Sequence, residues 1–193
     1  MKLWVGLGNP GAEHAAQRHN IGFMAAERIA LRHHFGPWRR KFRGAASDGV
    51  IAGEKILLLK PLTYMNESGE SVQAAMAFHR LAPGDVLVFH DELDLAPGKV
   101  RVKQGGGAAG HNGLRSLDRH VGNATLRVRL GIGHPGHKDL VHNHVLGNFA
   151  KSDRAWLELL LDAVADAAPL LAEGRAEEFM TRVALLTQPA KDR

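Results

Sequence analysis

The sequence predicts an α/β fold, namely a single domain in which a mixed, twisted β-sheet is sandwiched between helices. Short apolar segments typical of buried strands alternate along the chain with longer segments of helical periodicity. Their order combines parallel crossovers with hairpins, which indicates a sheet of mixed type. The chain has 193 residues, of which 45% are hydrophobic, and we expect one domain over residues 1–193.

Each element has its own signal in the sequence. Apolar runs and alternating segments predict strands at residues 3–7, 45–51, 55–60, 86–89, 100–103 and 126–132. Helical spacing and capping residues predict helices at residues 21–35, 67–80, 112–120, 152–172 and 177–186. The turn at residues 52–54 makes a hairpin of the second and third strands.

Four details accompany these predictions. Residues 36–43, which are rich in basic and aromatic side chains, are expected to form a loop. Ser152 is expected to cap the long helix, and Pro169 to kink or end it. The tail after Gln188 is polar, so we expect it to be loose. The last two strands of the list alternate apolar and basic residues, which predicts an outward face carrying Arg101, Lys103, Arg127 and Arg129.

Composition and charge limit the classes of function. The chain has no cysteine, which excludes disulfides, thiolate zinc sites and cysteine nucleophiles. No signal peptide is recognisable and no apolar run reaches the roughly 18–20 residues of a membrane span, so we expect a cytoplasmic protein. Residues 1–152 carry a net charge of +8 and residues 153–193 one of −3. This asymmetry favours an anionic partner, such as a nucleic acid, that contacts the first part.

A glycine-rich loop follows the first predicted strand. Residues 6–11, GLGNPG, match the dinucleotide-binding pattern G-x-G-x-x-G. Two features argue against a nucleotide: Pro10 lacks the N–H that a pyrophosphate needs, and no acidic strand end follows about twenty residues later. A tight turn without a ligand is the simpler alternative, but it leaves Asn9 unexplained.

Histidine and carboxylate residues suggest acid–base chemistry. Asp91 follows a buried strand, and a histidine oriented by a carboxylate can act as a general base. His19 is a candidate, although an exposed surface position is the simpler expectation for any one of the 12 histidines. Spacing alone leaves two alternatives for Asp91, Glu92 and Asp94, namely a solvated turn or a magnesium site. The pairs His134/His137 and His142/His144 lack acidic partners and favour exposed histidines over metal ligands.

Further candidate residues lie in predicted turns. Asn9, Asn66 and Asn112 are each placed in a loop, where asparagine is most often a cap or turn residue. A glycine-rich segment at residues 105–113 lies beside basic residues, and a flexible loop of this kind can close over a phosphate or a single strand.

Taken together and in order, the motifs resemble those of the bacterial-type peptidyl-tRNA hydrolases. The matching segments, spread over residues 3–149, are GLGNPG at 6–11, RHN at 18–20, KP at 60–61, TYMN at 63–66, SG at 68–69, HDELD at 90–94, GGG at 105–107, GHNGL at 110–114 and RLGIGHP at 129–135. The number of separate matches makes the resemblance far more specific than any single motif.

The resemblance implies a monomeric enzyme, without metal or cofactor, that cleaves the ester between a peptide and the 3′ ribose of tRNA. It implies that His19 takes a proton from the attacking water and that Asp91 orients His19. Asn9 would meet the peptide, and Asn66 and Asn112 would hold the substrate near the scissile bond, with Asn66 a candidate oxyanion donor. Our candidates for tRNA contact outside these motif roles are Lys103 and Arg129.

The sequence departs from the family pattern in three places. His14 replaces a tyrosine and Tyr64 replaces a phenylalanine, at positions expected to line the site of the tRNA end. Residues 108–109, both alanine, replace a more polar pair in the glycine loop. Residues 39–43 could also bind tRNA, although a solvated charged segment is equally consistent with the pattern. The rival functions are an RNA-binding protein without turnover and a nucleotide-dependent oxidoreductase.

Overall fold

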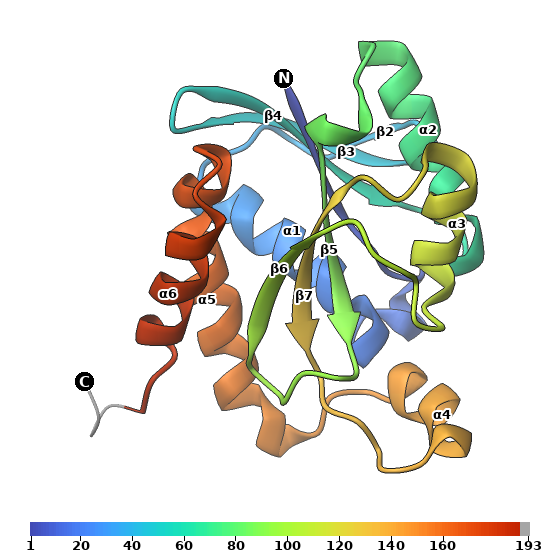
Figure 1. The fold of residues 1–193 in the computed structure, drawn as a ribbon, viewed down its shortest axis with the longest axis vertical. Coiled ribbons are helices and arrows are strands. Elements are labelled where there is room, and N and C mark those ends of the chain that lie inside the picture. Colours follow the sequence, from blue (N-terminus) through green and yellow to red (C-terminus); the bar gives the residue numbers. More distant parts are fainter. Residues whose placement is uncertain (190–193) are drawn as a thin grey trace.

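Seven strands form one sheet in the computed structural model, which describes residues 1–189 (Figure 1). The strands are β1 Lys2–Gly6, β2 Arg39–Lys41, β3 Gly44–Ile51, β4 Glu54–Pro61, β5 Val86–Glu92, β6 Val100–Gln104 and β7 Leu126–Gly131. The helices are α1 Ile21–Arg32, α2 Ser68–His79, α3 Asn112–Val121, α4 Val141–Leu146, α5 Arg154–Ala172 and α6 Ala176–Leu186.

The sheet is mixed, as the sequence predicts, and its order is β2-β3-β4-β1-β5-β7-β6. The central strand β1 is parallel to both β4 and β5, and β5 is parallel to β7. The outer pairs β2–β3, β3–β4 and β6–β7 are antiparallel, and β3–β4 is the predicted hairpin. The parallel strands therefore present their carboxyl ends at one edge.

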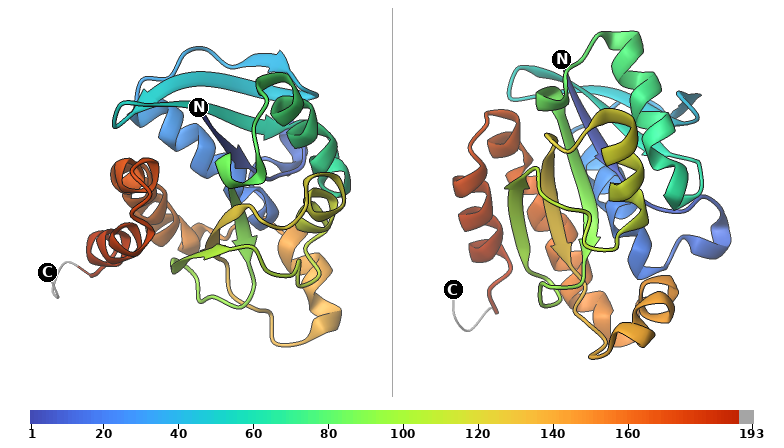
Figure 2. Two further views of the ribbon diagram at one scale, coloured as in Figure 1. Left: turned by 45° about the horizontal axis from the view of Figure 1, so that its top comes forward. Right: turned by 45° about the vertical axis from the view of Figure 1, so that its right-hand side comes forward.

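Helices cover both faces of the sheet (Figure 2). Alternate residues of the central strands point to opposite faces. Trp4 and Phe89 pack in one core with α1, α5 and α6, whereas Val5 and Val88 pack in a second core with α2 and α3. The sandwich that the sequence predicts is confirmed, and it leaves the strand ends free for polar residues.

Two glycines allow α1 to lie directly on the sheet. A Cβ atom on Gly6 would lie 2.2 Å from the carbonyl oxygen of Gly22, and one on Gly22 would lie 2.4 Å from the carbonyl oxygen of Phe89. Only glycine permits backbones to approach so closely. The start of α1, just after His19, is thereby fixed against β5.

Two local predictions are wrong. Residues 36–43 are not all loop, because Arg39–Lys41 pairs with β3 as the edge strand β2. Ser152 is not the cap of α5. Asp153 is the residue that precedes the helix, and its carboxylate accepts the N–H of Ala150 at 2.8 Å. The long helix runs to Ala172 as predicted, and Pro169 does not end it: the carbonyl of Ala165, which loses its helical donor to the proline, lies 2.7 Å from Nε2 of His33 instead.

The predicted loose tail extends beyond the described part of the chain, since residues 190–193 lie outside it. Within residues 1–189, no helix combines the length and the apolar character needed to cross a bilayer.

Candidate active site

The predicted functional segments meet at the carboxyl edge of the parallel strands. Asn9 follows β1, Asn66 follows β4 and Asp91 lies near the end of β5. Figure 1 shows α4 beyond the ends of β5 and β7. Open α/β sheets place their ligands at this edge.

Asp91 is buried and accepts hydrogen bonds from two histidines. Its Oδ2 lies 2.8 Å from Nδ1 of His19, and its Oδ1 lies 2.8 Å from Nε2 of His111. Burial would raise the pKa of this carboxyl group, but the two neighbouring imidazoles and their hydrogen bonds lower it well below the usual range. Asp91 is therefore an ionised carboxylate inside the protein, and neither a solvated turn residue nor a free magnesium ligand.

His111 links the glycine loop to Asp91 in one defined tautomer. Its Nδ1 accepts the backbone N–H groups of Gly113 at 3.1 Å and Leu114 at 3.3 Å, so it caps the start of α3. Because Nδ1 accepts, the proton of the neutral ring is on Nε2 and is donated to Asp91. The His111 side chain thus holds both the start of α3 and the carboxylate of Asp91 in place.

His19 has the complementary arrangement. Its Nδ1 donates to Asp91, which leaves the lone pair of Nε2 available, and no residue of the described chain bonds Nε2. Burial alone would lower the pKa of His19, but the charge of Asp91 and the hydrogen bond to it outweigh burial, so the pKa is raised. The imidazole is a stronger base than a free histidine.

His90 directly precedes Asp91 on β5 and is buried. Its Nδ1 donates to the carbonyl of Asp91 at 2.9 Å, and its ring packs edge-on against His111 at 5.3 Å between centroids. Burial and the proximity of His111 lower the pKa of His90 to about 4. A neutral ring therefore supports the strand end that carries Asp91.

Asn9 is held rigidly by the loops around it. Asn20 forms two hydrogen bonds of 2.9 Å with the backbone of Asn9, one to its N–H and one to its carbonyl. The side-chain oxygen of Asn9 accepts the N–H of Met65 at 2.8 Å. The GLGNPG loop is thus a turn that ties β1 to the segment carrying Asn66.

A cleft of about 710 Å³ opens above these groups. Its lining includes five of the predicted site residues, namely His19, Asp91, Lys103, Asn112 and Arg129. Loop and helix residues complete it, including Leu93, Gly110, His111, Lys138 and Val145. The structure therefore brings His19, its carboxylate partner Asp91, one asparagine and two cations to a single crevice.

The basic face predicted for β6 and β7 is only partly exposed. Arg127, predicted to point outward, is buried: it pairs with Asp118 at 2.7 Å and donates to the carbonyls of Gly106 and Gly107. That prediction is wrong because α3 and the glycine loop cover this face. Arg129 is half-buried and pairs with Glu92 at 2.8 Å.

The remaining predicted residues do not line this cleft. Asn66 is exposed in the 3₁₀ turn Met65–Glu67, and Tyr64, 67% exposed, borders a separate depression. His14 is half-buried and its Nδ1 lies 3.1 Å from the side-chain oxygen of Gln17. Asn112, which does line the cleft, is the first residue of α3, as the predicted helix at residues 112–120 has it, and is not in the loop that the glycine-rich motif suggested.

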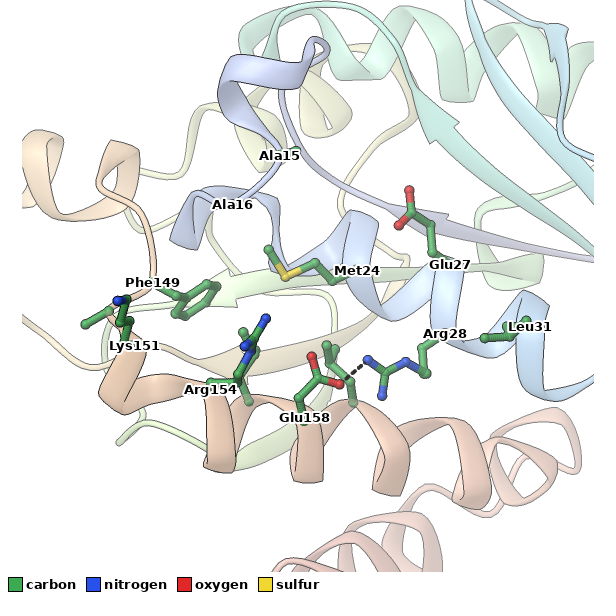
Figure 3. Close-up of a pocket in the computed structure, with 13 residues that line it drawn as sticks. Ala15, Ala16, Met24, Glu27, Arg28, Leu31, Phe149, Lys151, Arg154 and Glu158 are labelled. Atoms are coloured by element: carbon green, nitrogen blue, oxygen red, sulfur yellow. Dashed lines mark hydrogen bonds and ion pairs between the residues drawn. The ribbon is translucent and has the colours of Figure 1, made fainter.

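A larger hollow of about 840 Å³ lies elsewhere, between α1 and α5 (Figure 3). Met24 and Leu157 contribute to its apolar wall, and an ion pair between Arg28 and Glu158 crosses its rim. It contains no histidine–carboxylate couple, so the smaller cleft is the candidate active site.

One group of metal-ligating side chains occurs within residues 1–189, formed by His19, Asp91 and His111. Their facing atoms already bond one another, so a cation at this place would have to replace both hydrogen bonds. The ring nitrogens of His134 and His137 accept backbone N–H groups within their own turns.

The chain matches the family model described as peptidyl-tRNA hydrolase over residues 3–192. It belongs to the peptidyl-tRNA hydrolase family. The peptidyl-tRNA hydrolases of Granulibacter bethesdensis and Acidiphilium cryptum are 71% and 68% identical to it, and the alignments cover 96% and 97% of this chain and 96% and 98% of theirs. The crystal structure of peptidyl-tRNA hydrolase from Acinetobacter baumannii has a TM-score of 0.89 at 41% identity, over 95% of this chain and 94% of that one.

Membership of the peptidyl-tRNA hydrolase family confirms the resemblance drawn from the motifs and the expectation of a hydrolase. The sequence pointed to the His19 and Asp91 segments but assigned no role to His111 or to Asn20. Both residues lie within motifs that match the family, Asn20 in RHN at 18–20 and His111 in GHNGL at 110–114. A histidine directly before a predicted helix start was the available signal for His111, because caps occupy that position.

Proposed function

We propose that this peptidyl-tRNA hydrolase cleaves the ester between the peptide and the 3′ ribose of tRNA with a water molecule activated by His19. The hydrogen-bonded couple of His19 and Asp91 at the base of the cleft carries this proposal. An ester is more easily hydrolysed than an amide, so an oriented base and water suffice without a nucleophilic side chain.

The tautomer of His19 determines which of its nitrogens can take a proton in the reaction. The free Nε2 of His19 takes a proton from water, whose oxygen attacks the ester carbonyl carbon, and Asp91 stabilises the imidazolium that forms. The carbon–oxygen bond to the ribose then breaks, and His19 returns the proton to the ribose oxygen. The products are tRNA with a free hydroxyl and the peptide carboxylic acid, which then loses its proton to water.

His111 supports this chemistry as a positioning residue. Its Nε2–H satisfies the second oxygen of Asp91, which keeps the carboxylate oriented toward His19. Because α3 starts beside this ring, Asn112 is placed at the rim of the same cleft.

The other predicted residues receive substrate-binding roles. We propose that Asn66 and Asn112 hold the scissile bond, with Asn66 as oxyanion donor, and that Asn9 meets the peptide. Lys103 and Arg129 would bind tRNA phosphates from the cleft wall. His14 and Tyr64 lie outside the cleft, where they would contact the tRNA end.

The decisive experiment is release of N-acetylated amino acid from charged tRNA. His19→Asn should lower kcat by about 10²–10⁴-fold, because general-base catalysis is lost. The control is His34→Asn, which changes an exposed histidine after α1 and should retain activity. Full activity of His19→Asn would exclude the proposed base, and RNA binding without turnover by the wild type would favour a binding protein.

We further propose that the enzyme acts as a monomer in the cytoplasm, where peptidyl-tRNA arises. Light scattering on the purified chain tests the first part, and fractionation of cells tests the second.

A further inference from the structure

The short helix α4 forms one wall of the candidate active-site cleft. Val141, His142 and Val145 of this helix line the cleft, together with Lys138 just before it. The helix has six residues and none of them is buried. A helix this short is not stable on its own in water. The position of α4 must therefore come from the contacts that it makes with neighbouring segments.

The chain that leaves α4 runs antiparallel to the segment that leads to His19. The N–H of Arg18 donates to the carbonyl of Gly147 at 3.0 Å, and the N–H of Phe149 donates to the carbonyl of Ala16 at 3.0 Å. The residues between these two pairs form an antiparallel β-bridge. The exit of α4 and the turn that carries His19 are therefore joined through their backbones.

The side chain of Arg18 adds three contacts to this junction. Its Nη1 donates to the carbonyl of His144, in the last turn of α4, at 3.2 Å. Its Nη2 lies 3.9 Å from the carboxylate of Asp153, which directly precedes α5. Its guanidinium carbon lies 5.9 Å from the ring centre of Phe149. Because hydrogen bonds from a charged donor are the stronger ones, Arg18 is well suited to link the end of α4 to the start of α5.

Gly147 shows how closely Arg18 packs against the end of α4. A Cβ atom on Gly147 would lie 2.9 Å from Nη1 of Arg18. The guanidinium thus lies directly on the backbone at this point. Arg18 is not among the described residues that line the cleft, so any effect on a bound substrate passes through α4.

A second contact holds α4 independently of Arg18. Nε2 of His144 donates to the carbonyl of Gly133, in the loop after β7, at 2.9 Å. Removal of the Arg18 side chain should therefore loosen α4 without detaching it from the protein.

Resting on the proposed active site, we propose that Arg18 is a positioning residue for the hydrolysis. It holds α4 against the turn that carries His19, so that this wall of the cleft and the proposed base keep a fixed separation. A substrate that binds against a mobile wall bears the cost of ordering it, whereas a wall that is already held in place carries no such cost.

An arginine that bridges helices can also serve stability alone, and Arg28 is a residue of this kind. It pairs with Glu158 and Asp162 and so joins α1 to α5. Its side chain is 21% exposed, close to the 19% of Arg18, but it borders the hollow between α1 and α5 and not the cleft. Arg28 is therefore the matched control for Arg18.

The test compares Arg18→Met with Arg28→Met, since methionine keeps an apolar stem and removes the donors. Both variants should lower the midpoint of urea denaturation. Only Arg18→Met should accelerate backbone hydrogen exchange in residues 141–147, by about tenfold, which corresponds to the loss of one charge-assisted hydrogen bond.

The kinetics of the same variants separate positioning from chemistry. With N-acetyl-phenylalanyl-tRNA, Arg18→Met should raise KM about five- to tenfold and change kcat less than about threefold. The acid limb of kcat/KM should stay at the wild-type pH, because the bond between His19 and Asp91 is untouched. Arg28→Met should leave KM unchanged. KM should also rise with N-acetyl-phenylalanyl-adenosine, an ester without phosphate.

Three results would overturn the proposal. They are equal exchange rates of residues 141–147 in Arg18→Met and Arg28→Met, faster exchange at an unchanged KM, and a rise in KM confined to the tRNA substrate, which would make Arg18 a direct phosphate ligand. If the wild type shows no turnover, the proposed function fails, while the exchange rates still decide whether Arg18 holds α4.

Arg18→Lys replaces Arg18→Met if the latter does not fold. Lysine keeps the charge, but its single ammonium cannot bond the carbonyl of His144 and lie near Asp153 in the way that the two arms of a guanidinium do. Exchange in residues 141–147 should then be about threefold faster than in the wild type. An unchanged exchange rate would contradict the proposal.

Discussion

At the scale of single residues, the site depends on which ring nitrogen of each histidine carries the proton. The cap that His111 forms on α3 sets its tautomer, and that tautomer directs an N–H to Asp91. Asp91 then accepts from Nδ1 of His19, which exposes the basic nitrogen to the cleft. A backbone cap thereby sets the position of the free lone pair on His19, the proposed base, two side chains away.

Replacing Asp91 tests this chain of contacts. Because the charge of Asp91 raises the pKa of His19, Asp91→Asn should shift the acid limb of kcat/KM to lower pH. It should also lower kcat/KM by about 10²–10⁴-fold, since the imidazolium loses its counter-charge. The pH profile of ester hydrolysis measures both effects.

Glu92→Gln is the matched control, because Glu92 pairs with Arg129 and not with His19. The acid limb of kcat/KM for Glu92→Gln should lie at the same pH as that of the wild type. An unshifted limb in Asp91→Asn would mean that another group titrates.

At the scale of elements, the packing of α2 on α3 sets the separation of two asparagines. Asn66 lies just before α2 and Asn112 begins α3. The N–H of Gly69 donates to the Ser116 hydroxyl at 2.8 Å, and a Cβ atom on Gly69 would lie 2.3 Å from the Ser116 carbonyl oxygen. The two helices are therefore in direct backbone contact.

Gly69→Ala should force these helices apart. We expect the free energy of unfolding to fall by about 1–3 kcal/mol, as is usual when atoms are added to a packed interior. The midpoint of urea denaturation measures the change. Gly84→Ala is the control, since a Cβ atom there meets nothing within 4 Å. Equal midpoints for the two variants would show that the helix pair can adjust.

At the scale of the whole molecule, the buried His90 links stability to pH. Its pKa is about 4 in the folded protein because of burial, whereas an unfolded histidine titrates near 6.5. Between these values the unfolded chain binds a proton that the folded chain does not. Stability is therefore present above the unfolded value and is lost as the pH falls toward 4. His19 has the opposite sign, since its raised pKa stabilises the fold at low pH and that contribution is lost as the pH rises through the folded value.

The contribution of His90 can be isolated by substitution. Acidification from pH 6.5 to pH 4 should cost the wild type about 3 kcal/mol through His90 alone. His90→Phe keeps a ring in the core and should reduce this loss. Urea unfolding at several pH values measures it, and parallel pH curves for the two proteins would contradict the assignment.

The sequence alone predicted several elements of the fold and part of the candidate site. Runs such as residues 86–89 and the helical spacing after Ile21 identified β5 and α1, because side-chain periodicity is a local property. The end of β5 then indicated Asp91, and the family resemblance paired it with His19, whose Nδ1 the structure places 2.8 Å from the Asp91 carboxylate. The resemblance to one family rested on short motifs that occur in the family's order along the chain. The match to the family model agrees with that resemblance.

The tertiary structure alone decided which surfaces are covered and which groups meet. Alternation in β7 put Arg127 on the correct face, but only the packing of α3 and the glycine loop made that face an interior. The bond between His111 and Asp91 joins positions 20 residues apart, and that between His19 and Asp91 joins positions 72 apart. The local sequence pattern determines which way a side chain points. Its hydrogen-bonding partner is brought to it only when distant segments of the chain fold together.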